Sequence, residues 1–175
     1  MSERVEVLIS EEELKARIAE LGKQLTEEYR GKNLRLICIL KGGVFFTCEL
    51  AKHIDLDLRM DFMATSSYGS GTKSSGIVKI TKDLDDPIEG DDVLIVEDII
   101  DSGRTLSYLI EILHKRKPNS IKLCTMLNKP GRRELPVSID YTGFEIPDAF
   151  VVGYGLDYDQ KYRNLPYIGV VKGVE

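Results

Sequence analysis

Residues 93–105 combine an apolar run with acids and a turn of small polar residues. The continuous apolar run 93–96 is typical of a strand covered on both faces, and a helical pattern follows the turn. At such a junction the hydroxyls and backbone N–H groups of Ser102, Gly103 and Thr105 can bind an anion, which the helix dipole stabilises by about 0.3–1 kcal/mol. The turn is therefore predicted to bind a phosphate.

Carboxylates beside the turn narrow the choice of anion. A nucleoside triphosphate loop is excluded, because this turn lacks the Gly-x-x-x-x-Gly-Lys-[Ser/Thr] spacing. Glu97, Asp98 and Asp101 would repel a polyphosphate laid across them, but carboxylates can accept hydrogen bonds from sugar hydroxyls or hold Mg²⁺. The combination favours a ribose 5-phosphate unit. The alternative is a capped helix behind a solvated acidic turn.

The same segment resembles the phosphoribosyl pyrophosphate motif of the type I phosphoribosyltransferases, and the acid at Asp101 resembles their hypoxanthine-guanine branch. Similarity continues at residues 40–43, at 67–69, at Lys129 and across 143–163, which together span nearly the whole chain. The resemblance implies an α/β fold, in which helices flank a mainly parallel, twisted, Rossmann-like sheet that carries a small hood subdomain. It also implies Mg²⁺-dependent purine salvage, in which hypoxanthine or guanine receives ribose 5-phosphate from phosphoribosyl pyrophosphate.

The resemblance makes Asp101 the general acid or base at the purine imidazole nitrogen, a role worth about 10²–10⁴-fold in rate. Because an aspartate is normally ionised near neutral pH, we expect an apolar or like-charged environment around it. The alternative is that Asp101 only caps the following helix.

Donor binding is also assigned by resemblance. The turn of Ser102, Gly103, Arg104 and Thr105 is expected to bind the 5-phosphate, and Glu97 and Asp98 are expected to bind the ribose hydroxyls. The expected magnesium ligands are Glu97, Asp98 and Asp157. The diphosphate is expected to bind Lys41, Gly42 and Arg163. The family commonly has a non-proline cis peptide before this lysine, so we predict one between Leu40 and Lys41. Without the resemblance, a lysine beside two glycines is an ordinary turn.

The purine is assigned to Lys129, Phe150, Val151 and Asp157. Lys129 can donate to a 6-oxo group, which selects hypoxanthine or guanine over adenine. Phe150 would stack on the base, Val151 would offer backbone groups, and Asp157 would approach the 2-position. Taken singly, Phe150 is more often a core residue and Lys129 more often faces solvent.

A glycine- and serine-rich loop, residues 68–76, has few apolar anchors. The resemblance at Ser67 and Tyr68 implies that it is a lid that excludes water during transfer. The alternative is a passive exposed loop.

Alternating helices and strands must position these residues. A capping box at Ser10 and Glu13 predicts a helix that ends near Gly31. Apolar patterns predict strands at 34–40, 56–64, 77–81, from 93 and at 121–127, and helices at 44–54 and from 106 to about 118. Such alternation predicts a mainly parallel sheet. Residues 40–42, 97–98 and 129 should meet where the strands of this sheet have their carboxyl ends.

Composition restricts the class of protein. A length of 175 residues fits one domain, with a core of about 10–127 and a hood formed by 1–9 and 128–175. The net charge of −5 argues against nucleic-acid binding. Neither an export segment nor a membrane span is visible, so we expect a cytoplasmic protein. We expect reduced, buried thiols at Cys38, Cys48 and Cys124, and a solvated turn for the acids of residues 83–92.

Four further points stay open. One alternative to an enzyme is a transcription regulator of the same fold that senses phosphoribosyl pyrophosphate, for which we would expect a basic face and altered catalytic positions. Another is an enzyme for adenine or orotate, whose relatives generally lack an acid at Asp101. The family implies a homodimer or a homotetramer, and no residue decides whether xanthine is accepted.

Overall fold

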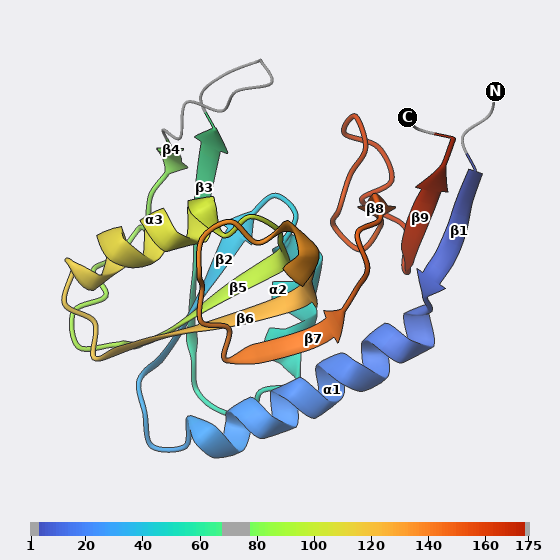
Figure 1. Cartoon of the computed structure of the whole chain (residues 1–175). Coiled ribbons are helices and arrows are strands. Elements are labelled where there is room, and N and C mark those ends of the chain that lie inside the picture. The colour runs from blue at the N-terminus through green and yellow to red at the C-terminus, as the bar shows by residue number, and fades with distance from the viewer. Residues whose placement is uncertain (1–3, 68–77, 174–175) are drawn as a thin grey trace.

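The computed structural model describes residues 4–67 and 78–173 (Figure 1). Within these residues the helices are α1 (Glu11–Glu28), α2 (Val44–Lys52), α3 (Arg104–His114) and a 3-10 turn, η1 (Pro130–Arg132). The strands are β1 (Arg4–Ile9), β2 (Leu34–Leu40), β3 (Arg59–Ser67), β4 (Val78–Lys82), β5 (Asp92–Ile100), β6 (Ser120–Asn128), β7 (Tyr141–Glu145), β8 (Val151–Val152) and β9 (Ile168–Lys172).

A six-stranded sheet in the order β4-β3-β2-β5-β6-β7 forms the centre of the molecule. All neighbouring pairs are parallel except β3 with β4. Helices α1 and α2 cover one face and α3 covers the other (Figure 1). The predicted α/β fold with a mainly parallel sheet is therefore confirmed.

The two central strands bury both of their faces. Leu36 and Leu94 pack with the α1 and α2 side chains, whereas their neighbours Ile37 and Ile95 pack with α3. Successive side chains of a strand point to opposite faces, so a strand between two helical layers must be apolar throughout. This requirement explains the continuous apolar runs of β2 and β5.

Helix α1 begins where the sequence predicts. The Ser10 backbone N–H donates to Glu13 Oε2 at 2.8 Å, and the Glu13 N–H donates to Ser10 Oγ at 3.1 Å. Its buried face consists of Leu14, Ile18, Leu21 and Leu25, together with Gly22 and Thr26. None of the described helices is both long enough and apolar enough to cross a bilayer.

A smaller antiparallel sheet, β1-β9-β8, lies beside the carboxyl ends of the central strands (Figure 1). The chain after β6 supplies strands to both sheets, because β7 pairs with β6 while β8 and β9 pair with each other. The two chain ends thus meet in the small sheet.

Two expectations about local structure are wrong in part. Strand β3 begins at Arg59 rather than at residue 56, because its pairing with β2 starts where Arg59 lies opposite Arg35. Cys38 and Cys124 are buried, but Cys48 is exposed. The buried side of α2 is formed by Phe46, Thr47 and Leu50, which leaves Cys48 on its outer side.

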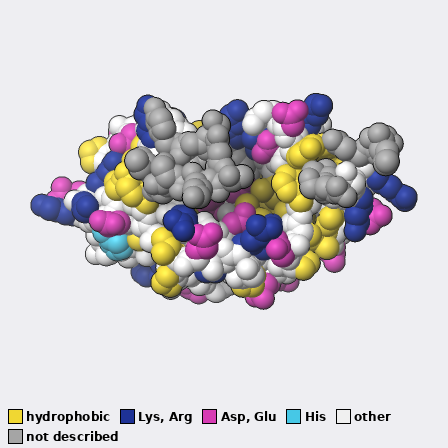
Figure 2. Space-filling view, turned by 45° about the horizontal axis from the view of Figure 1, so that its top comes forward, with side chains coloured by type: hydrophobic (Ala, Val, Ile, Leu, Met, Phe, Trp, Pro, Cys, Tyr) yellow, Lys and Arg dark blue, Asp and Glu magenta, His cyan; other side chains and the backbone are white. Residues whose placement is uncertain are grey.

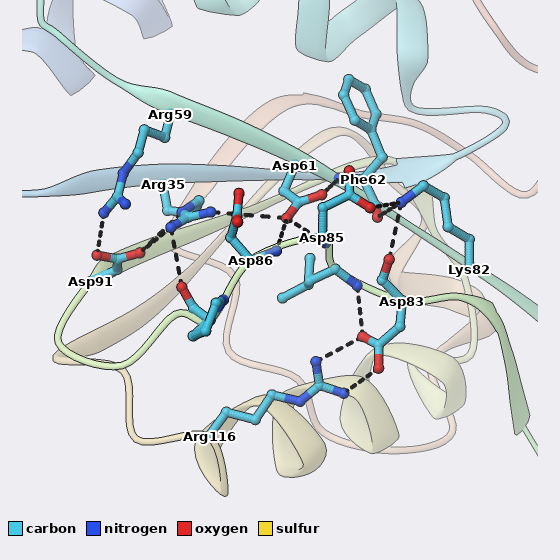
Figure 3. Close-up of polar contacts among 12 residues, drawn as sticks. Arg35, Arg59, Asp61, Phe62, Lys82, Asp83, Asp85, Asp86, Asp91 and Arg116 are labelled. Atoms are coloured by element: carbon cyan, nitrogen blue, oxygen red, sulfur yellow. Dashed lines mark hydrogen bonds and ion pairs between the residues drawn. The ribbon is translucent and has the colours of Figure 1, made fainter.

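A charged network joins the amino ends of the central strands (Figure 3). Arg35 of β2 is only 1% exposed, and its guanidinium lies 2.8 Å from Asp91 Oδ2. Arg35 Nη2 also donates to the Pro87 carbonyl at 3.2 Å, and Arg59 Nη2 donates to Asp91 Oδ1 at 2.6 Å. Asp61 of β3, 3.9 Å from Arg35 Nη1, completes the set. The network ties together β2, β3 and the approach to β5.

The expectation that the acids of residues 83–92 form a solvated turn is therefore wrong for part of the run. Asp91 and Asp92 are 5% and 6% exposed. Asp91 faces the buried Arg35, whereas Asp92 Oδ1 accepts hydrogen bonds from the Asn119 amide and the Ser120 hydroxyl. Asp83 is exposed and binds Arg116 through both oxygens.

Removing Asp91 should destabilise the fold strongly. The variant Asp91→Ala removes the carboxylate that hydrogen-bonds the buried Arg35 and leaves only Asp61, 3.9 Å away, and breaking a buried pair in this way typically costs about 3–5 kcal/mol. The matched control is Asp85→Ala, because Asp85 is 76% exposed and pairs with Lys82 at 3.2 Å; its cost should stay below about 1 kcal/mol. Urea unfolding measures both, and equal losses would contradict the role given to the network.

Candidate functional site

A pocket of about 300 Å³ opens where β5 ends. Its walls come from the end of β5, the turn 101–103 and the first turn of α3, with Ile39 and Thr65 from the neighbouring strands. Figure 2 looks down on this side of the molecule, on which acidic and basic side chains are interspersed. The pocket lies at the carboxyl ends of parallel strands, where open α/β sheets bind their ligands.

The turn before α3 is built for close backbone approach. Gly103 has a φ of +81°, and a Cβ atom there would lie 2.7 Å from the Leu135 carbonyl oxygen. Only glycine fits this turn without strain. Ser102, Gly103 and Thr105 all line the pocket, and the N-terminus of α3 favours an anion there. Arg104, on the first turn, forms an ion pair with Glu134.

Glu97 and Asp98 stand side by side near the end of β5. Glu97 is 8% exposed, and burial together with the neighbouring Asp98 carboxylate holds the pKa of Glu97 well above its usual value. Burial raises the pKa of Asp98 too. A Cβ atom at Gly42 would lie 1.7 Å from Asp98 Oδ2, so a side chain at position 42 would displace this carboxylate.

These two carboxylates fit the oxygen ligands that Mg²⁺ prefers. Among the described residues, no group of three or more potential ligand side chains is gathered as in an all-protein metal cage. Mg²⁺ is usually held by one or two carboxylates together with substrate oxygens. The chemistry of Glu97 and Asp98 therefore suits a metal that is shared with a phosphorylated substrate.

The turn after β2 contains the predicted cis peptide, between Leu40 and Lys41. Lys41 Nζ donates to Gln160 Oε1 at 3.3 Å. Gly155, with a φ of +100°, lies so close that a Cβ atom there would be 2.1 Å from the Gly42 carbonyl oxygen. The loop before β9 therefore packs directly on this turn.

Gln160 also joins Lys41 to Arg163, because Arg163 Nη2 donates to the same Oε1 atom at 3.1 Å. Arg163 contacts Asp157 Oδ1 at 3.2 Å, and the Gln160 N–H donates to Asp157 Oδ2 at 2.9 Å. The structure thus brings the two cations predicted for the diphosphate, Lys41 and Arg163, together through Gln160. Sequence reasoning missed Gln160, since a single glutamine in a turn-rich segment carries no pattern.

Lys129 lies at the end of β6, next to the end of β5. It is 8% exposed, and its Nζ atom lies 3.6 Å from Asp101 Oδ1 and 3.9 Å from Asp148 Oδ1. Its N–H donates to the Ile100 carbonyl at 3.1 Å, which couples the two strand ends. Lys129 therefore does not face solvent, and it stands beside the candidate acid or base.

The environment predicted for Asp101 is wrong. Its side chain is 53% exposed and faces the ammonium group of Lys129, rather than an apolar wall or another acid. The helix-cap alternative also fails, because the N-cap residue of α3 is Gly103 and no side chain caps the helix.

Val151 begins β8 of the neighbouring small sheet, and Phe150 lies directly before it. Phe150 is 49% exposed, and its ring meets Tyr158 edge to face at 5.5 Å between centroids. Val151 is buried and pairs with Val170 of β9. Phe150 is thus available to a ligand, unlike a core residue. Ser67 ends β3, whereas Tyr68 and the rest of the predicted lid lie outside the described residues.

Comparison with known proteins gives consistent results. The family model for the phosphoribosyl transferase domain matches residues 8–159. The hypoxanthine-guanine phosphoribosyltransferase of Bacillus subtilis (strain 168) is 59% identical, over 95% of this chain and 92% of that protein. The hypoxanthine phosphoribosyltransferase of Escherichia coli (strain K12) is 55% identical, over 98% and 97% respectively. A crystal structure of the Staphylococcus aureus hypoxanthine phosphoribosyltransferase matches with a TM-score of 0.92 and 52% identity, over 95% of this chain and 91% of that chain.

Longer relatives also match. The bifunctional protein TilS/HprT of Listeria innocua is 58% identical over 95% of this chain, which spans only 26% of that protein.

Replacing Glu97 by glutamine should stabilise the protein at neutral pH. The folded-state pKa of Glu97 lies above its unfolded value, so the stability from its protonation is present below about pH 4.3 and is lost as the pH rises through the folded pKa. Glutamine mimics protonated Glu97 at every pH. Urea unfolding from pH 4 to 8 should show Glu97→Gln becoming progressively more stable than wild type as the pH rises towards 8, and almost equal to it at pH 4.

The matched control is Glu89→Gln, at an exposed glutamate, for which no pH-dependent gain is expected. A gain for Glu97→Gln that stays constant across this pH range would contradict the buried-pair interpretation.

Proposed function

Because this chain belongs to the phosphoribosyltransferase family, and within it to the hypoxanthine-guanine phosphoribosyltransferases, we propose that it converts hypoxanthine or guanine and phosphoribosyl pyrophosphate to the nucleoside monophosphate and diphosphate. In this reaction a bond forms between a purine imidazole nitrogen and C1 of the ribose, and the bond from C1 to the diphosphate oxygen breaks. The nitrogen loses its proton, and diphosphate leaves with the bonding electrons.

The observation that carries the proposal is the meeting of Asp101 and Lys129 beside the phosphate turn. Their charged groups are 3.6 Å apart, so one planar base could contact both. Lys129 donates to the 6-oxo group, while Asp101 holds the proton that the imidazole nitrogen gives up. Adenine carries an amino group at the 6-position, which is a donor and cannot accept from Lys129.

The remaining residues hold the sugar donor. The backbone N–H groups and hydroxyls of Ser102, Gly103, Arg104 and Thr105 bind the 5-phosphate, and Glu97 and Asp98 accept the ribose hydroxyls. Glu97 and Asp98 are the proposed direct holders of Mg²⁺, and Asp157 would reach the metal through a bound water. When bound, the metal would neutralise part of the charge on the diphosphate.

The diphosphate and the base lie on the hood side of the pocket in this proposal. Lys41, Gly42 and Arg163 receive the diphosphate, and the contact of Gln160 with both cations supports their acting together. Phe150 stacks on the purine, Val151 offers its backbone to the base edge, and Asp157 approaches the 2-position. The segment that begins at Ser67 and Tyr68 closes over the pocket as a lid and excludes water.

We further propose a cytoplasmic enzyme that forms a homodimer or a homotetramer and binds neither nucleic acid nor membrane. The interspersed charges on the face shown in Figure 2 and the net charge of −5 give no support to the regulator, which would need a basic face. Sedimentation velocity would determine the number of subunits.

Turnover should occur with hypoxanthine, guanine or both when phosphoribosyl pyrophosphate and Mg²⁺ are present. The assay offers hypoxanthine, guanine, xanthine, adenine and orotate separately and follows nucleotide formation. Adenine should give no product above background, because its 6-amino group cannot accept from Lys129, and orotate should give none because it is a pyrimidine without an imidazole nitrogen for Asp101. Turnover of adenine or orotate alone would contradict the base assignment, and donor binding without turnover of any base would favour the regulator.

The same assay tests the role of Asp101. The variant Asp101→Asn should lower kcat by about 10²–10⁴-fold, since the amide cannot take the proton. Asp86→Asn is the control, because Asp86 is exposed and lies with the charged network at the opposite end of the strands (Figure 3). Equal activity of the two variants would contradict general acid-base catalysis by Asp101.

A further inference from the structure

The chain that follows η1 supports the phosphate turn from its outer side. The N–H groups of Glu134 and Leu135 donate to the Ser102 carbonyl at 2.9 and 3.0 Å. The Arg133 Nε atom donates to the Asp101 carbonyl at 3.0 Å. Two consecutive carbonyls of the turn are therefore bound by one short segment, 133–135.

These contacts orient the peptide planes of the turn. In a planar trans peptide the C=O group and the N–H group of the next residue point in opposite directions. Bonds that hold the carbonyls of Asp101 and Ser102 towards segment 133–135 therefore turn the N–H groups of Ser102 and Gly103 the other way. Both residues line the pocket, which is where a phosphate would lie.

Arg133 makes a second connection. Its Nη2 atom donates to Asn128 Oδ1 at 2.6 Å, and Asn128 is the residue directly before Lys129. One guanidinium thus joins the backbone of Asp101, at the end of β5, to the end of β6. The Arg133 Cδ atom also lies 3.2 Å from the position that a Cβ atom of Gly103 would occupy, so its stem covers the glycine of the turn.

We propose that Arg133 is a positioning residue, whose forked guanidinium orients the phosphate-binding N–H groups and sets the spacing between Asp101 and Lys129. This inference rests on the proposed function, because it assigns the turn to the 5-phosphate and the two strand ends to the base. Arg133 acts through Asp101, Ser102 and Asn128 and touches no substrate itself.

The neighbouring Arg132 provides a control matched in charge and place. Its side chain contacts Asp148, to whose Oδ1 atom the Arg132 Nε donates at 2.9 Å, rather than a carbonyl of the turn. Removing Arg132 takes away the same positive charge near the site, but it leaves both carbonyl contacts of the turn in place.

The experiment measures the Kd of phosphoribosyl pyrophosphate with Mg²⁺ by calorimetry, and kcat with the base that wild type uses best. Arg133→Met should raise this Kd by about 10-fold to 100-fold and lower kcat, because the turn loses its orientation and Asp101 its position. Arg133→Lys should fall between Arg133→Met and wild type, since one ammonium cannot span both acceptors. Arg132→Met should keep Kd and kcat within about 2-fold of wild type.

The outcomes separate the two proposals. If wild type itself neither binds the donor nor turns over a base, the proposed function fails and this inference fails with it. If wild type is active and Arg133→Met lowers the melting temperature while Kd and kcat stay at wild-type values, Arg133 is only structural. Equal losses of donor affinity and kcat in Arg132→Met and Arg133→Met would mean that only the positive charge matters, which would overturn the proposal. Should Arg133→Met not fold, wild-type values for Arg133→Lys would overturn the proposal.

Discussion

The ion pair of Arg35 with Asp91 is the interaction on which the position of the site depends. A guanidinium that is 1% exposed inside a parallel sheet must be neutralised locally, and Asp91 lies directly before β5. The pair therefore fixes where β5 starts relative to β2, as the pairing of Leu34 with Asp92 shows. Once the amino ends are aligned, strand length decides where the carboxyl ends of the two strands emerge.

The two ends of the central strands use buried charge differently. At the amino ends, opposite charges lie together and neutralise one another, so that losing either partner would be costly (Figure 3). At the carboxyl ends, Glu97 and Asp98 are like charges, and burial raises the pKa of both. Such an arrangement costs stability unless a ligand compensates it, and for that reason perturbed carboxyl groups are typical of functional sites.

Much of the fold could be predicted from local patterns. The apolar runs of β2 and β5, and the capping box of α1, depend on neighbours in the sequence, and they occur where expected.

Contacts between distant segments could not be predicted. Asp85 and Asp91 look alike in the acidic run, but only Asp91 meets a buried arginine. Gln160 and Arg133 acquire their importance in the same way, because their partners lie on other elements. The surroundings of Asp101 could not be predicted either, because Lys129, which faces it, follows a different strand.

A crystal structure of the complex with inosine 5′-monophosphate would show whether the carboxyl ends of β5 and β6 form one nucleotide site. We expect phosphate oxygens within about 2.7–3.2 Å of the backbone nitrogens of residues 102–105, and the 6-oxo group within the same range of Lys129 Nζ. A nucleotide bound outside this pocket, or one with its base at the phosphate turn, would contradict this expectation.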